Sequence, residues 1–166
     1  MKVKELCLIA IMASLEVVVF TSFSFVLYLE CITLTIVLFA MVFPRRMACM
    51  SSFLFGRLNM ILVQGITPWS IGYFLIYPVY SYGIASNRTY LSKHFLVLCG
   101  VCAFCSFLTG QLLQLPFLFF SKYVTFFYII MGLKTSLIQG IVSFISCMIL
   151  YKPIEKVLLM IKEKML

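Results

Sequence analysis

Six long apolar runs limit what this chain can fold into. They cover about residues 6–27, 31–43, 47–64, 69–86, 95–120 and 124–150. Short stretches with proline, glycine, asparagine or basic residues separate them. An α-helix needs roughly 20 apolar residues to cross the hydrocarbon core of a bilayer. We therefore expect an all-α integral membrane bundle of six transmembrane helices, which forms a single transmembrane domain over residues 1–166.

The composition excludes an ordinary soluble domain. Hydrophobic residues make up 64% of the 166 positions and charged residues only 11%, whereas soluble domains average about half and a quarter. A net charge of +8 would suggest nucleic acid as the partner of a soluble protein. Here the basic residues fall in alternate loops, so we expect membrane lipid around the chain and no nucleic acid.

The basic residues also predict the orientation. Ten of them fall on one side of a six-span topology, and only Lys122 falls clearly in a loop on the other. Loops rich in lysine and arginine stay in the cytoplasm, which predicts cytoplasmic N- and C-termini. The ten are Lys2, Lys4, Arg45, Arg46, Arg88, Lys93, Lys152, Lys156, Lys162 and Lys164.

Two opposite charges fall inside the predicted spans. Glu16 and Arg57 each lie ten residues above the inner end of their run, at a depth of about 15 Å. Charges at that depth are costly and call for a partner. Their equal depth favours a structural ion pair that joins the first span to the third, with ligand binding as the alternative.

Polar side chains gather again toward the outer side. Three glutamines and Lys134 lie at a similar depth, roughly 24–28 Å above the cytoplasmic boundary. Beside them the fourth span has an aromatic face, formed by Trp69, Tyr73 and Tyr77. An aromatic belt at the membrane interface would explain the aromatic residues alone. Hydrogen bonds between helices would explain the glutamines alone. Together they predict an outward-facing pocket for a small molecule, where Lys134 either receives an anion or extends to the surface. The predicted binding residues are Gln64, Trp69, Tyr73, Gln111, Gln114 and Lys134.

Nothing in the sequence predicts catalysis, a metal or a cofactor. Cys99, Cys102 and Cys105 form a C-x2-C-x2-C run, but it lies within an apolar helix and lacks the loop that wraps an iron–sulfur cluster. We expect these thiols to pack in the core. No Walker loop and no nucleophile elbow is present, so ATP hydrolysis would need another protein.

Three stretches of the sequence form a recognisable pattern: the alanine-rich first helix around Ala10, Ala13 and Ser14, residues 64–78 (QGITPWSIGYFLIYP), and residues 132–140 (GLKTSLIQG) with the later YKP at 151–153. On these stretches the chain resembles the substrate-binding (S) component of an energy-coupling factor (ECF) vitamin transporter. Small residues spaced along a helix let another helix approach closely.

This resemblance implies a multi-pass protein of the bacterial cytoplasmic membrane that captures a vitamin-like molecule for an ABC importer. Its partners would be a transmembrane coupling subunit, docked on Ala10, Ala13 and Ser14, and two ATPase subunits. A stand-alone membrane carrier or channel and a non-transporting membrane scaffold are the alternatives. A carrier or channel would need a polar path through the inner half, where the sequence offers little beyond Glu16 and Arg57.

Overall fold

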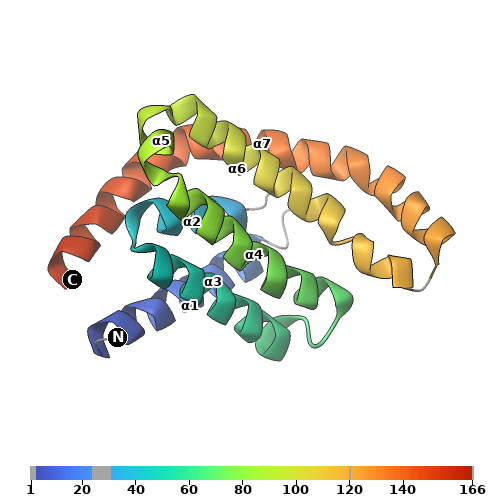
Figure 1. Ribbon diagram of the computed structural model, residues 1–166, viewed down its shortest axis with the longest axis horizontal. Helices are drawn as coiled ribbons and strands as arrows, with labels where there is room; N and C mark the ends of the chain where they lie inside the picture. The colour runs from blue at the N-terminus through green and yellow to red at the C-terminus, as the bar shows by residue number, and fades with distance from the viewer. Residues whose placement is uncertain (1–2, 24–30, 120, 166) are drawn as a thin grey trace.

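The computed structural model describes residues 3–23, 31–119 and 121–165, and this part of the chain is helical throughout apart from short connections (Figure 1). The predicted all-α fold is therefore confirmed there. The helices are α1 (Val3–Phe23), α2 (Ile32–Val42), α3 (Arg45–Leu58), α4 (Pro68–Ser86), α5 (Arg88–Lys93), α6 (Phe95–Leu112) and α7 (Lys122–Met165). A π-helical turn, η1 (Asn59–Val63), continues α3, and a 3-10 turn, η2 (Leu115–Phe119), follows α6.

Each of the six predicted apolar runs overlaps one of the longer helices. The predicted ends at residues 27 and 120, and the basic residue Lys2, lie outside the described residues. The sequence did not predict α5 as a helix, nor that α7 would continue past residue 150 through Pro153. The run of 44 residues in α7 is about 66 Å long, roughly twice the thickness of a hydrocarbon core.

Three of the described helices are long and apolar enough to cross a membrane: α1, α6 with its continuation to Phe119, and α7. Helix α2 has only 11 residues, which span about 16 Å. It is the central helix of the bundle, since all its residues except Thr35 are buried and it contacts α1, α3, α4, α6 and α7.

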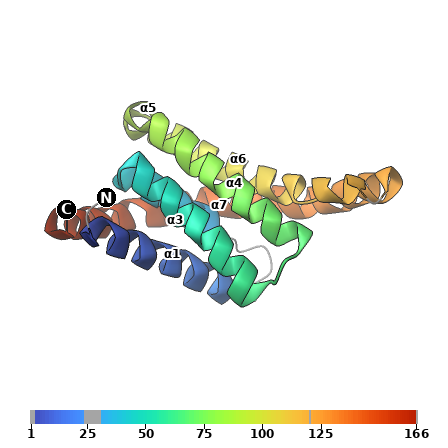
Figure 2. The ribbon, with the colours of Figure 1, turned by 60° about the horizontal axis from the view of Figure 1, so that its bottom comes forward.

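Two groups of helices surround α2. Helices α1, α3 and α4 lie on one side, while α6 and α7 run side by side as a hairpin that extends beyond the rest of the bundle (Figures 1 and 2). The two ends of the chain lie near the same end of the molecule in both views. We call this the inner end.

Basic side chains close the inner end of α2. Arg88 of α5 donates from Nε to the Ala40 carbonyl at 3.2 Å, and its guanidinium also bonds the Phe43 carbonyl. Lys162 of α7 donates from Nζ to the Val42 carbonyl at 2.9 Å. The last carbonyls of a helix have no partner within the helix, and cations stabilise its negative end. The two cations thus fix α5 and the last turns of α7 to α2.

The predicted ion pair between Glu16 and Arg57 is wrong. Glu16 is fully buried, and its Oε1 accepts a hydrogen bond from Ser51 Oγ at 3.2 Å. Arg57 is exposed, with its guanidinium 5.8 and 5.3 Å from the ring centroids of Phe53 and Phe74. Ser51 and Arg57 are six residues apart and so differ by about 120° around α3. Equal depth did not place the two charges on facing sides of their helices.

The small-residue face of α1 is also smaller than predicted. Ala10 and Ser14 are exposed, and Ser14 Oγ donates to the Ala10 carbonyl at 2.9 Å. Ala13 is fully buried in the bundle, about 100° around the helix from Ser14. Only Ala10 and Ser14 are therefore open to a partner helix.

Candidate ligand-binding pocket

A cavity of about 460 Å³ is lined by the first turns of α4, the end of α6 and the first half of α7. The start of α4 and the end of α6 lie away from the chain termini (Figure 1). Four of the six predicted binding residues line the cavity. The lining residues are Gln64, Trp69, Tyr73, Gly110, Leu113, Gln114, Gly132, Thr135, Ser136 and Gln139. Such a volume is within the usual range for sites that bind small molecules.

The turn before α4 places Trp69 at the pocket. Gly65 has a φ of 69°, in the left-handed region that glycine adopts without strain. Thr67 then caps the helix: its Oγ1 accepts from the Ser70 backbone N–H at 3.1 Å, while Ser70 Oγ accepts from the Thr67 N–H at 2.9 Å. Pro68 occupies the first turn, where its missing N–H costs nothing. Trp69 is therefore held in the first turn of a capped helix.

Gln64 enters the pocket from the π-helical turn. Its backbone N–H donates to the Asn59 carbonyl at 2.9 Å, five residues back, so the chain is wider here than an α-helix. Asn59 is fully buried, and its Nδ2 donates to Gln64 Oε1 at 3.3 Å. Single π turns often occur at functional sites. This one fixes the amide of Gln64 with its carbonyl already bonded.

An aromatic wall stands behind the pocket. The rings of Tyr73 and Tyr77 are stacked at 5.3 Å with 20° between their planes, and Phe20 meets Tyr73 edge-on at 5.4 Å. Trp69 packs against Phe117 of η2 at 5.6 Å. Tyr77 is fully buried, so the predicted aromatic face divides into a core residue and two pocket residues.

Gln111 does not line the cavity but supports it. Its Nε2 donates to Ser136 Oγ at 2.8 Å, which links α6 to α7. The helices approach closely beside this bond, because a Cβ added at Gly110 would lie 2.4 Å from Ser136 Oγ. Gln111 is thus a positioning residue for Ser136.

Lys134 is not part of the pocket. Its side chain is exposed and is not among the residues that line the cavity. It lies about 160° around α7 from Gly132 and from Ser136.

The sequence prediction missed most of the α7 side of the pocket. Gly132, Thr135, Ser136 and Gln139 follow the spacing i, i+3, i+4 and i+7, which places them on one face of a helix. A search for a polar helical face in this run would have found them and would have excluded Lys134.

Three polar side chains of the pocket form no hydrogen bond to any described residue. They are Gln114, in the turn between α6 and η2, and Thr135 and Gln139 on α7. All three side chains are half-buried and lie at the wall of a cavity, where water or a ligand can form hydrogen bonds with them. They are available to a ligand.

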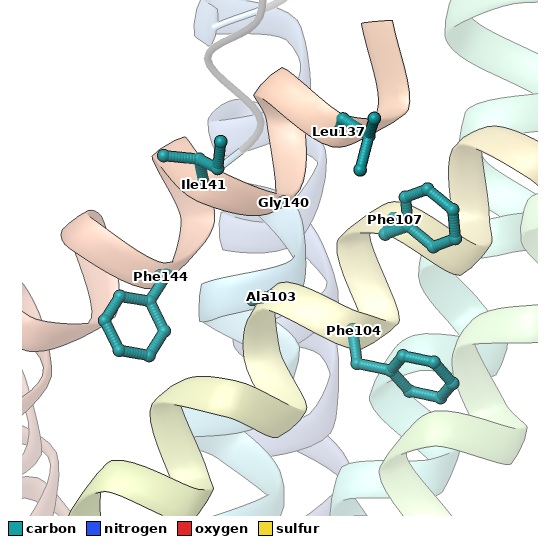
Figure 3. Close-up of a pocket in the computed structure, with 7 residues that line it drawn as sticks. All are labelled: Ala103, Phe104, Phe107, Leu137, Gly140, Ile141 and Phe144. Atoms are coloured by element: carbon teal, nitrogen blue, oxygen red, sulfur yellow. The ribbon is translucent and has the colours of Figure 1, made fainter. Parts of the chain in front are cut away.

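A second cavity, of about 420 Å³, lies between residues 103–107 of α6 and residues 137–144 of α7. Its lining differs in chemistry from that of the first cavity. Its walls are the side chains of Phe104, Phe107, Leu137, Ile141 and Phe144 with Ala103 and Gly140 (Figure 3). No polar side chain lines it among the described residues. It offers only hydrocarbon contact.

The chemistry of the outer cavity is that of binding by stacking and neutral hydrogen bonds. Amides, hydroxyls and aromatic rings line it, and no lysine, arginine, histidine or carboxylate does so within the described part of the chain. Cys99, Cys102 and Cys105 are buried in the core, away from this cavity. Comparison with protein-family models, with characterised proteins and with solved structures finds no match.

Proposed function

We propose that this protein is the substrate-binding component of an ECF-type importer, which captures a small vitamin-like molecule in the cavity between α4, α6 and α7. The observation that carries the proposal is a polar cavity with unpartnered amides in a strongly apolar helical chain. Polar groups facing an apolar bundle are costly unless a ligand, water or another group satisfies them.

In this proposal the chain crosses the bacterial cytoplasmic membrane six times with both termini inside. Two features support it: the ends of the chain lie near each other (Figure 2), and Arg88 and Lys162 bind the same end of α2. The cavity would then open toward the outside. Short α2 is covered by its neighbours, so it need not span the bilayer alone.

The partners would be a transmembrane coupling subunit and two ATPases, since the sequence holds no Walker loop. Ala10 and Ser14 would form the docking face on α1, because small exposed side chains allow two helices to pack closely. Leucine at Ala10 or Ser14 should block transport and leave substrate binding unchanged.

A channel is the weaker alternative. Below Tyr73 the interior is filled by Tyr77 and Phe55, both fully buried, with ring centroids 5.7 Å apart. Fully buried rings thus occupy the interior next to Tyr73. A scaffold protein would not require the cavity.

The test is uptake in cells that express this chain with and without a coupling subunit and its ATPases. Uptake of a compound that co-purifies with the protein should require all the components. A compound that enters as fast without the ATPases would show a stand-alone carrier. No co-purifying compound and no association with a coupling subunit would favour a scaffold.

A further inference from the structure

We propose that the ligand of this pocket is uncharged at neutral pH and carries an amide-like edge on a planar ring, as in a lactam, a cyclic imide or a ring carboxamide. The inference rests on the proposed function and adds the chemical class of the substrate. It follows from charge, hydrogen bonding and stacking in turn.

An ionic ligand would need a counter-charge in the cavity. An unpaired ion is expensive in a site with little water, and the cavity walls contain no ionised group among the described residues. Lys134 lies on another face of α7, Arg57 lies over Phe53 and Phe74, and Glu16 is bonded to Ser51. Neither a carboxylate nor an ammonium group would find a counter-charge.

Two side-chain amides of the cavity have no hydrogen-bond partner in the described part of the chain. Gln114, after the end of α6, and Gln139 on α7 line the same cavity, and a primary amide offers donors and an acceptor side by side. Its natural complement is another amide edge, with one N–H and one carbonyl. Two glutamines at the wall of one cavity would thus select a ring that carries such an edge.

Two further groups bias the site toward acceptors on the ligand. The carbonyl of Gln64 accepts from Asn59, which leaves its NH₂ group to donate. Ser136 Oγ accepts from Gln111, which leaves its hydroxyl hydrogen to donate. A ligand with more carbonyl or ring-nitrogen acceptors than N–H donors fits this excess of donors.

Aromatic rings form part of the cavity wall. Trp69 and Tyr73 line the same cavity as the amides. Aromatic rings prefer offset-stacked or edge-to-face contact with another ring. A planar heterocycle satisfies this wall and brings its edge to the glutamines.

The test uses the purified full chain in detergent. The protein is equilibrated with a bacterial metabolite extract and washed, and the retained compounds are identified by mass spectrometry. Trp69 is the only tryptophan, so its fluorescence reports whether a retained compound binds at this pocket. We expect a retained compound that is neutral at pH 7, contains a ring amide and changes Trp69 fluorescence.

A variant sharpens the test. Gln139→Glu places a negative charge in the pocket and should weaken binding of the retained compound by about tenfold or more, whereas Lys134→Gln, outside the pocket, should leave its affinity unchanged. A charged retained compound that alters Trp69 fluorescence, or one that binds Gln139→Glu more tightly, would overturn the inferred class but not the proposed function. If nothing is retained and Trp69 fluorescence stays constant, both fail.

Discussion

The two ends of the bundle use polar side chains in opposite ways. At the inner end Arg88 and Lys162 bind the carbonyls of α2, and the Tyr151 hydroxyl donates to Glu155 Oε1 at 2.9 Å. In the pocket the side-chain amides of Gln114 and Gln139 form no hydrogen bond to the described part of the chain. Polar groups that close helix ends contribute to folding, whereas polar groups left at a cavity wall are free to bind. Substitutions should therefore separate stability from binding according to the end of the bundle.

The largest effect on stability should come from Arg88. Arg88→Gln removes the cation that bonds the Ala40 and Phe43 carbonyls, and a hydrogen bond to a charged group contributes about 1.5–3 kcal/mol. We expect the free energy of unfolding to fall by about 3 kcal/mol or more, as measured by circular dichroism in detergent. The matched control is Lys93→Gln on the exposed face of α5. Equal stability of the two variants would show that Arg88 does not stabilise the inner end of α2.

A smaller, mixed effect is expected at Gly110. In Gly110→Ala the new methyl group would lie 2.4 Å from Ser136 Oγ, so the serine must rotate and lose its bond to Gln111. Binding should weaken while stability changes by about 1–3 kcal/mol. The control is Gly100→Ala, where the methyl group meets nothing within 4 Å and should stabilise α6 by up to about 1 kcal/mol. Unchanged binding in Gly110→Ala would mean that Ser136 does not contact the ligand.

Removal of one unpartnered amide should affect binding alone. Gln114→Ala or Gln139→Ala should weaken affinity by about five- to a hundredfold, because each would lose a hydrogen bond to the ligand but none to the protein. Gln111→Ala is the comparison, since it breaks the bond to Ser136 and should lower stability by about 1 kcal/mol. Calorimetry and thermal unfolding measure the two quantities. A drop in stability for Gln114→Ala without a loss of affinity would show that Gln114 contributes to folding and not to ligand binding.

The smallest effect is expected at Lys134. Its side chain is exposed on the face of α7 away from the pocket, so Lys134→Ala should change neither affinity nor stability. A clear loss of affinity in a binding titration would place a cation at the ligand after all, and the ligand would then be anionic.

The sequence predicted helices better than it predicted their faces. The apolar runs located each long helix. The depth of residues along the runs correctly predicted that Gln64, Trp69 and Gln114 line one cavity. Depth alone failed for Lys134 and for the pairing of Glu16 with Arg57, because position along a helix does not fix the direction of a side chain around it.

Other features depend on contacts that no local pattern encodes. Ala13 is buried because α1 packs into the bundle with that face inward. The end of α7 bonds α2 through Lys162 and Val42, which are 120 residues apart. Gln139 could have been found from its spacing to Ser136 and Gly132, since all three share one helix face.

The most direct test combines the two amides. The compound that co-purifies with the wild-type chain is titrated by calorimetry into the double variant Gln114→Ala/Gln139→Ala and into Arg88→Gln, and thermal unfolding of both is recorded. We predict that the double variant loses about a hundredfold or more in affinity at an unchanged unfolding temperature, while Arg88→Gln unfolds earlier and binds normally where it is folded. Wild-type affinity in the double variant would contradict a binding site between α4, α6 and α7.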